Sequence, residues 1–225
     1  MTVTQNTLFR AAGAAAVAAG LIFVGVQINH PYLDATSITT SDVMTRNALK
    51  MVMAALALAG ITGIYLHQVT KMGVLGLLGF VVFAAGYFSM FGTEFVAALV
   101  LPTISHSSTS YVNDVIAAAN NRPRTGDIGR MQIALVFTGI TYVGGGFIFG
   151  LALFRANLLA RWAAALLAVG ALATVAVGLV PQYERLFAIP TGVALIGLGY
   201  SLWRERRTPA AARMLNTVDS QVDAV

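Results

Sequence analysis

A single carboxyl group lies within a long apolar stretch of the chain. Glu94 is the only charged residue between Gly73 and Leu101. Because an ionisable side chain inside a membrane is energetically expensive, such a residue is a candidate for a functional role. In a dry setting the neutral form of a carboxyl group is favoured, and this form can donate a proton to a lipophilic substrate. Two other roles stay open: a protonation switch for transport, or a structural acid paired with Arg130, Lys50 or a hydroxyl group.

Three aromatic residues precede Glu94 at helical spacing. Phe83, Tyr87 and Phe91 lie eleven, seven and three positions before it, so a helix would bring them to the same face as the acid. Aromatic ring faces stabilise positive charge, which suits protonation of a lipophilic substrate. We predict Glu94, Tyr87 and His30 as the catalytic residues, with Glu94 as the proton donor.

Polar residues gather near one set of helix ends, which we expect to face the cell exterior. Lys50 and Gln132 lie slightly inside their apolar runs, which favours a cavity over simple snorkelling of charged side chains to the interface. The predicted cavity opens to the outer face or the outer leaflet. The residues predicted to bind substrate are Gln27, Asn29, Lys50, Phe83, Phe91, His106, Arg130 and Gln132.

Two histidines at the same boundary raise the question of a metal. His30 follows the first apolar run and His106 follows the third, twelve residues after Glu94. Two histidines and a carboxylate can bind zinc, but the spacing lacks the pairing on one helix that marks the HExxH motif. The chain also has no cysteine, which excludes thiolate ligands and disulfides. We therefore predict no metal and no cofactor.

The elements that must position these residues are apolar runs long enough for transmembrane helices. A bilayer core about 30 Å thick needs roughly 20 apolar residues in a helix. The runs do not alternate between polar and apolar residues as barrel strands would. The first resembles a signal peptide, but its 18 apolar residues exceed the usual signal core. The six runs are Ala11–Ile28, Lys50–Tyr65, Gly73–Leu101, Met131–Phe154, Trp162–Val180 and Leu186–Trp203. We predict that the long outer segment between the third and fourth runs, Pro102–Arg130, is a loop.

Small residues recur within these runs at four-residue spacing, which lets helix backbones approach closely in lipid. Tight packing within one bundle explains this pattern better than a dedicated dimer motif. The stripes are Ala12, Ala16 and Gly20; Ala55, Ala59 and Gly63; and Gly146 and Gly150.

Composition and charge set the environment and the orientation. The chain has 57% hydrophobic and only 10% charged residues, against about 25% charged in a soluble domain. The net charge of +5 comes without a basic arm, so no nucleic-acid partner is expected. Basic residues mark the cytoplasmic side, and an N-in, C-in arrangement places eight of them inside and six outside. We predict one transmembrane domain over residues 1–207 and a disordered cytoplasmic tail over 208–225.

Five segments carry a family resemblance. The chain resembles a group of uncharacterised bacterial six-helix membrane proteins that have no assigned activity. That resemblance implies a six-helix fold in the bacterial inner membrane and no particular chemistry. The segments are GLIFVGVQINHP (Gly20–Pro31), GIYLHQVTKMGVLGLLGF (Gly63–Phe80), TEFVAALVLP (Thr93–Pro102), GLALFRANLLARWAAALLAVG (Gly150–Gly170) and IPTGVALIGLGYSLWRER (Ile189–Arg206).

The sequence therefore predicts an all-α, multi-pass membrane protein with three functional hypotheses. The leading one is a membrane-embedded enzyme acting on an isoprenoid-like or lipid-like substrate, because Glu94 stands beside aromatic residues with few other polar groups across the bilayer. The second is a small transporter or permeation protein that uses Glu94 as its coupling acid. The third is a non-catalytic membrane partner or sensor. Membrane lipid and a lipophilic small molecule are the expected partners, and oligomers stay open.

Overall fold

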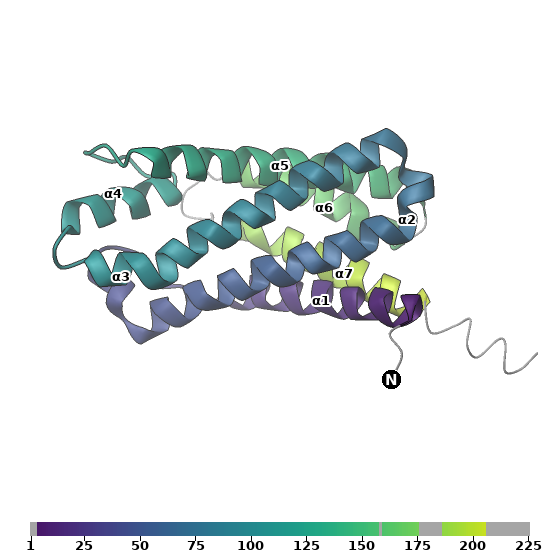
Figure 1. Cartoon of the computed structure of the whole chain (residues 1–225), viewed down its shortest axis with the longest axis horizontal. Helices are drawn as coiled ribbons and strands as arrows, with labels where there is room; N and C mark the ends of the chain where they lie inside the picture. Colours follow the sequence, from purple (N-terminus) through teal and green to yellow (C-terminus); the bar gives the residue numbers. More distant parts are fainter. Residues whose placement is uncertain (1–3, 158, 176–185, 206–225) are drawn as a thin grey trace, which may run out of the picture.

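The protein folds as an all-α bundle (Figure 1). The computed structural model describes residues 4–157, 159–175 and 186–205. The predicted tail over 208–225 and the last residues of the predicted fifth helix lie outside these ranges. The elements are α1 (Gln5–Gly25), a 3-10 turn (Ser37–Thr39), α2 (Ser41–Phe95), a π-helical turn (Val96–Val100), α3 (Leu101–Ile104), α4 (Thr109–Ala119), α5 (Arg130–Ala156), α6 (Arg161–Ala173), a 3-10 turn (Leu186–Ala188) and α7 (Ile189–Glu205).

Helix α2 contains two of the predicted spans, because the chain reverses direction at Gly73 (Figure 1). Gly73 has φ 57° and ψ −160°, a backbone region that is essentially open to glycine alone. Its two segments run on either side of this residue, as the second and third apolar runs predict. Together with α1, α5, α6 and α7 they give six helical rods.

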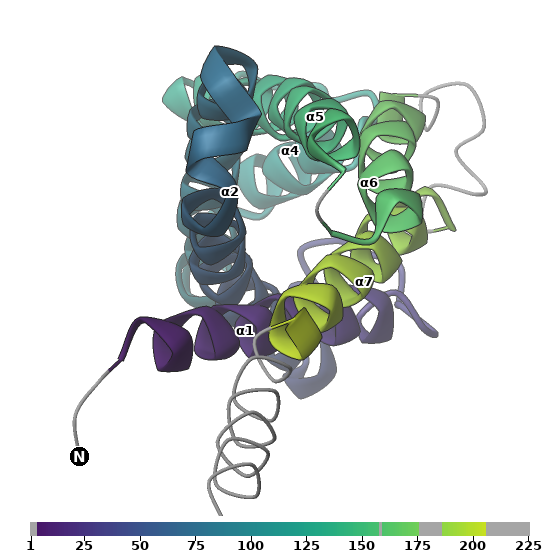
Figure 2. The same ribbon diagram turned by 90° about the vertical axis from the view of Figure 1, so that its right-hand side faces the viewer.

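These rods form a closed circuit when the bundle is viewed end-on (Figure 2). Helix α1 packs on α2, α2 on α5, α5 on α6, α6 on α7, and α7 returns to α1. The beginning of α1 and the end of α7 lie at one end, here called the terminal end. Helices α3 and α4 lie at the opposite end, here called the cavity end (Figure 1).

Glycines allow a close approach of two backbones in this circuit, between α1 and α7. A Cβ atom on Gly20 would stand 2.4 Å from the Gly192 carbonyl oxygen, and one on Gly13 would stand 2.7 Å from that of Gly199. The numbering runs in opposite directions along the two helices, so they are antiparallel. Such backbone contact needs residues without side chains, as in other helix pairs in lipid.

The predicted small-residue stripes meet neighbouring helices at most of their positions. Gly63 faces Ala12, Gly20 faces Gly192, and Gly150 faces Ala168. These contacts confirm packing within one bundle. The stripe through Ala55 and Ala59 was wrong as an interface, because both residues are exposed on the outer side of α2.

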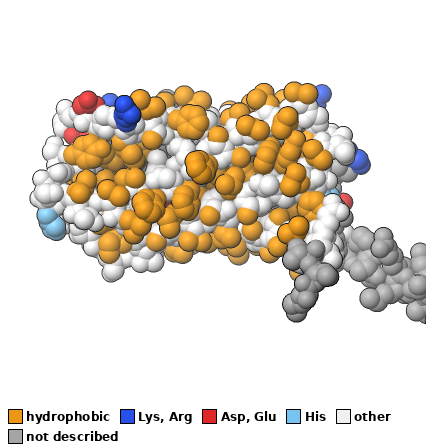
Figure 3. Space-filling view, viewed as in Figure 1, with side chains coloured by type: hydrophobic (Ala, Val, Ile, Leu, Met, Phe, Trp, Pro, Cys, Tyr) orange, Lys and Arg blue, Asp and Glu red, His pale blue; other side chains and the backbone are white. Residues whose placement is uncertain are grey.

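The sides of the bundle are apolar. Figure 3 shows hydrophobic side chains over most of the lateral face, with Lys, Arg, Asp and Glu gathered toward the two ends. Large exposed residues include Ile133, Ile140 and Phe88, each about 70% exposed. In the part of the chain that the structure describes, three apolar helices have the length to cross a membrane: α1, the continuous segment Ser41–Ile104, and α5. An apolar surface of this extent needs lipid around it, which indicates a multi-pass membrane protein.

Two features at the cavity end differ from the prediction. The second span was expected to begin near Lys50, but α2 begins at Ser41, where the Thr40 hydroxyl caps the Val43 amide at 3.4 Å. The segment between the third and fourth spans was expected to be a loop, but it contains α4. Charge marks where a helix leaves the apolar core of a membrane, and it does not mark where the helix itself ends.

Candidate functional site

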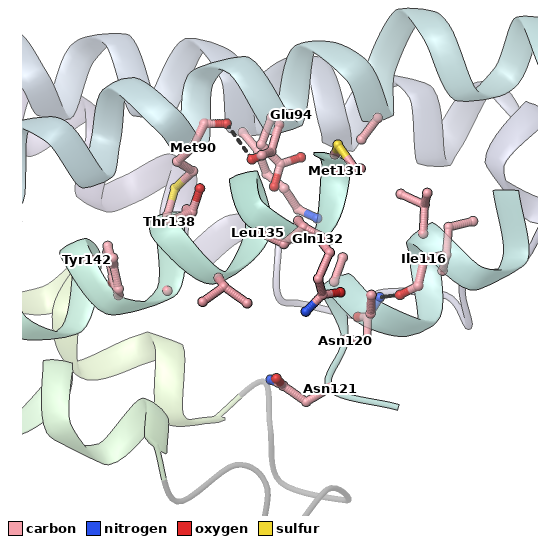
Figure 4. Close-up of a pocket in the computed structure, with 18 of the residues that line it drawn as sticks. Met90, Glu94, Ile116, Asn120, Asn121, Met131, Gln132, Leu135, Thr138 and Tyr142 are labelled. Atoms are coloured by element: carbon pink, nitrogen blue, oxygen red, sulfur yellow. Dashed lines mark hydrogen bonds between the residues drawn. The ribbon is translucent and has the colours of Figure 1, made fainter. Parts of the chain in front are cut away.

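A cavity of about 920 Å³ lies at the cavity end, among the second segment of α2, α4, α5 and the end of α6 (Figure 4). Its volume is near the top of the roughly 300–1,000 Å³ typical of small-molecule sites. Polar groups line it from both segments of α2, from α5 and from the residues that directly follow α4 and α6: Asn47, Lys50, Thr93, Glu94, Asn120, Asn121, Gln132, Thr138, Tyr142 and Thr174. The remaining lining is mostly aliphatic.

Glu94 lines this cavity one residue before the end of α2 and is partly exposed to it. Within the described part of the chain its carboxyl group accepts no hydrogen bond and forms no ion pair. The ammonium group of Lys50 acts on it electrostatically from beyond ion-pair distance. A carboxyl group without a direct partner is available to a molecule in the cavity.

Lys50 is held by a neighbouring amide. Its Nζ donates to the Asn47 Oδ1 at 3.4 Å, and the Asn47 Nδ2 donates in turn to the Ala97 carbonyl oxygen at 3.3 Å. Asn47 is only 2% exposed. This chain of contacts ties the first segment of α2 to the turn that follows Glu94.

That turn is π-helical because of the proline that follows it. The Leu101 amide bonds to the Val96 carbonyl, five residues back, so Ala97 loses its usual α-helical partner. Pro102 has no N–H, so it cannot donate a hydrogen bond to the Ala97 carbonyl oxygen either. Asn47 satisfies the Ala97 carbonyl that this geometry leaves free. Short π-helical turns occur frequently at functional sites.

Helix α4 and the 32–40 segment close the cavity end over a second apolar cluster. Its buried members are Ala35, Ile38, Val43, Leu101, Val112, Val115, Ile116 and Ile128. The Asn113 side chain accepts from the Ala35 amide at 2.7 Å, and Arg122 donates to the Leu33 carbonyl at 2.9 Å. We call residues 32–40 and 109–128 the cap.

Two carboxylates fix turns of the cap. The Thr125 amide donates to Asp114 at 2.8 Å, and this backbone bond is the main cause that lowers the pKa of Asp114. The Ser37 amide donates to Asp34 at 2.7 Å and likewise lowers the pKa of Asp34. The charged carboxylate forms of Asp34 and Asp114 therefore stabilise these two turns of the cap.

The predicted aromatic residues divide into two groups. Phe83 and Tyr87 are fully buried behind Tyr142, with ring centroids 5.7 Å and 5.8 Å from its ring. Tyr142 itself lines the cavity. Phe91 is 37% exposed and does not line it. A step of three residues leaves a helical side chain about 60° away from the face of Glu94.

Of the other predicted site residues, Lys50 and Gln132 line the cavity with Glu94, and five residues do not. His30 lies five residues after the end of α1, with its Nδ1 2.9 Å from the Pro31 carbonyl oxygen. Among the described residues, no group of three or more His, Asp and Glu side chains comes together in a way that could hold a metal ion. The residues outside the lining are Gln27, Asn29, His30, His106 and Arg130.

Sequence reasoning missed four lining residues that complete the site. Asn47 carried a usable signal, since it precedes Lys50 by three positions and shares its helical face. Asn120 and Asn121 follow α4, which was not expected, and Tyr142 stands in an uncharged run like many others. The Gln132 side chain extends toward Asn120 (Figure 4).

Comparison with known proteins assigns no chemistry to this site. The chain matches no family model, no curated protein and no solved structure. The function must therefore be argued from the cavity itself.

Proposed function

We propose that the chain is a membrane-embedded enzyme that binds a lipophilic substrate in the cavity, with Glu94 as the proton donor. One observation carries this proposal: the Glu94 carboxyl group faces a largely aliphatic cavity of about 920 Å³ and has no hydrogen-bond partner among the described residues. A purely structural acid would be expected to have a direct partner, because an unpaired buried polar group is costly.

The proposed chemistry is proton transfer to a carbon–carbon double bond. Neutral Glu94 gives its proton to one alkene carbon, and the π electron pair forms the new C–H bond. The adjacent carbon becomes a cation beside the Glu94 carboxylate, whose negative charge stabilises it. Loss of a proton from a neighbouring carbon to the Glu94 carboxylate restores the acid and leaves an isomerised alkene. The cycle needs no further reactant.

We also propose that the cavity end faces the cell exterior. The terminal end carries Arg10, Lys71, Arg155, Arg161 and Arg204 in or beside short connections. Basic residues in such connections favour the cytoplasmic side. Both the start of α1 and the end of α7 would then lie at the cytoplasmic face of a bacterial inner membrane.

One observation keeps a transporter as the second candidate. The π-helical turn directly after Glu94, with Pro102 behind it, interrupts the regular helix at the acid. Interrupted helices commonly frame coupling sites in transporters. In that case Glu94 would exchange its proton as the turn moves, without chemistry on the substrate.

Deuterium incorporation tests the proposed chemistry. Purified protein in lipid nanodiscs is incubated in D₂O with an isoprenoid alcohol such as farnesol, and mass spectrometry then measures deuterium in carbon-bound positions. We expect incorporation by the native chain and a loss of at least about 100-fold in Glu94→Gln, since general acids typically contribute 10²–10⁴-fold.

Asp127→Asn is the matched control, because Asp127 is an exposed carboxylate at the same end that does not line the cavity. It should leave the rate unchanged. Equal incorporation by the native chain and Glu94→Gln, with both correctly folded, would refute the role of Glu94 as donor.

A further inference from the structure

The cavity continues from Glu94 as a groove along α5. Val136, Gly139 and Ile140 line it at positions i, i+3 and i+4 of one helix face, and Val143 and Gly144 continue it one turn further. Val136 is 46% exposed and Ile140 is 68% exposed on the side of the bundle. The same residues thus face the cavity and the lateral surface, so the groove opens sideways.

The far wall of the groove comes from the end of the described part of α6. Thr174 and Val175 line the cavity, and Val175 is 65% exposed. From Gln132 to Gly144 the lining follows α5 for twelve residues, or roughly 18 Å at 1.5 Å per residue. This distance is more than half the thickness of a bilayer core of about 30 Å.

Two glycines keep the groove open. A Cβ atom on Gly139 or on Gly144 would meet no atom of the described residues within 4 Å. The other interface glycines of α5 differ, since a Cβ atom on Gly145 would stand 2.3 Å from the Phe83 backbone nitrogen. Gly139 and Gly144 are therefore not needed for helix packing, and the space beside them is free.

Polarity falls along the groove. Lys50, Glu94 and Gln132 lie near the cavity end, whereas the deeper lining consists of Met90, Tyr142, Val143 and other weakly polar or apolar residues. Figure 4 shows the same order, with Glu94 and Gln132 between Asn120 at one side and Tyr142 at the far side. A polar head and a hydrocarbon chain would each find a matching environment.

We propose that the groove between α5 and the end of α6 is a lateral portal for a single-chain amphiphile with an uncharged polar headgroup. The headgroup lies beside Glu94, and the chain extends along α5 past Gly139 and Gly144 to the lipid. This inference rests on the proposed function, because it names the class of substrate that Glu94 would protonate.

The charged and polar residues of the lining indicate which kind of headgroup the cavity would bind. Lys50 and Glu94 are the charged residues among the described side chains that line the cavity, and they are opposite in sign. Three amides, from Asn120, Asn121 and Gln132, add neutral donors and acceptors, and the Gln132 oxygen already accepts from Arg124, which lies outside the lining. A phosphate group would meet one ammonium group and a neighbouring carboxyl, whereas phosphate sites usually gather several cations or helix N-termini. A hydroxyl group can bond to all of these residues.

Photo-crosslinking tests the portal independently of catalysis. The native chain in nanodiscs is illuminated with a long-chain alcohol that carries a mid-chain diazirine, and mass spectrometry locates the adducts. We expect adducts on residues 136–144 and 174–175, and competition by the unlabelled alcohol. Gly139→Leu and Gly144→Leu should lower the yield at least about fivefold by filling the groove.

Gly92→Leu is the matched control, because Gly92 is exposed on α2, lines no part of the cavity and also has no atom within 4 Å of a Cβ position. It should leave the yield unchanged. Adducts spread evenly over the lateral surface, or equal yields in Gly139→Leu and Gly92→Leu, would overturn the portal. Stronger labelling by the alkyl phosphate of the same chain would overturn the uncharged headgroup.

The two experiments distinguish a failure of the portal from a failure of the proposed chemistry. Deuterium incorporation without groove adducts would refute the portal and leave Glu94 as the donor. Groove adducts without deuterium incorporation would support the portal and refute the chemistry.

Discussion

At the scale of single residues, Glu94 is informative because its carboxyl group faces open space. Lys50, the cationic group that acts on it, bonds to Asn47, and Asn47 bonds to the Ala97 carbonyl. Asn47 thus serves two purposes: it positions the one ammonium group of the described lining, and it satisfies a backbone oxygen that Pro102 leaves without an amide partner.

The role of Asn47 leads to a double-mutant prediction. Asn47→Leu should lower the free energy of unfolding by about 1–3 kcal/mol, because the Ala97 carbonyl becomes an unsatisfied buried acceptor. In a Pro102→Ala background, Asn47→Leu should lower the free energy of unfolding by less, since residue 102 regains an N–H that can donate to the Ala97 carbonyl oxygen. Thermal or denaturant unfolding in detergent measures all four proteins of the cycle. Equal costs in the two backgrounds would show that Asn47 does not act through Ala97.

The candidate site was predictable in part. Charge in an apolar run identified Glu94, and position slightly inside a run identified Lys50 and Gln132; all three line the cavity. The position of a residue along a predicted span gives its depth in the membrane. It does not give the rotation of the helix about its axis or the path of the chain beyond the helix end. For that reason His30 and His106, at the right depth, fall outside the lining, while Tyr142 belongs to it.

At the scale of elements, the cap shows how short polar contacts hold apolar pieces over the cavity. Helix α4 contributes Val115 and Ile116 to the cavity lining and buries Asp114 on the same side. Its apolar face is too short to be recognised as a helix in the sequence, which is why this segment was predicted as a loop. The cap stays in place partly through the carboxylates of Asp34 and Asp114.

The lowered pKa values of these two groups predict that acid loosens the cap. A carboxyl whose pKa is lower in the folded state stabilises that state above its unfolded pKa, and the contribution disappears as the pH falls through the folded pKa. Protection from hydrogen exchange at the amides of Ser37 and Thr125, corrected for the intrinsic effect of pH, should therefore decline below about pH 4.

Amide substitution provides the control for this acid effect. Asp114→Asn keeps an oxygen that can accept from the Thr125 amide but cannot titrate, so protection at Thr125 should lose its dependence on pH. Protection that stays constant down to pH 2 in the native chain would show that these carboxylates do not hold the cap.

At the scale of the whole molecule, the closed circuit of six rods follows from features that the sequence displays. Apolar runs of sufficient length predict the rods, and small residues predict where they approach, as at Gly20 with Gly192 and at Gly150 with Ala168. The circuit itself could not be predicted, because many arrangements bury the same small residues. The apolar lateral face lies between two ends that both carry charged side chains, which fits a helical bundle that crosses a membrane (Figure 3).

The central claim is that Glu94 lies in a cavity that opens at the outer face of the membrane. The chain has no cysteine, so single cysteines can be introduced without background. We would measure labelling of Glu94→Cys in intact cells by a small, membrane-impermeant methanethiosulfonate. The references are Ser107→Cys, which is exposed at the cavity end, Ala54→Cys, which is fully buried, and Lys71→Cys at the terminal end.

We expect Glu94→Cys to be labelled in intact cells, more slowly than Ser107→Cys and far faster than Ala54→Cys. Lys71→Cys should be labelled only after the cells are permeabilised. A long-chain alcohol should slow the reaction at position 94 and leave position 107 unaffected. Labelling of Glu94→Cys no faster than that of the buried Ala54→Cys, in protein that is inserted and folded, would contradict the claim.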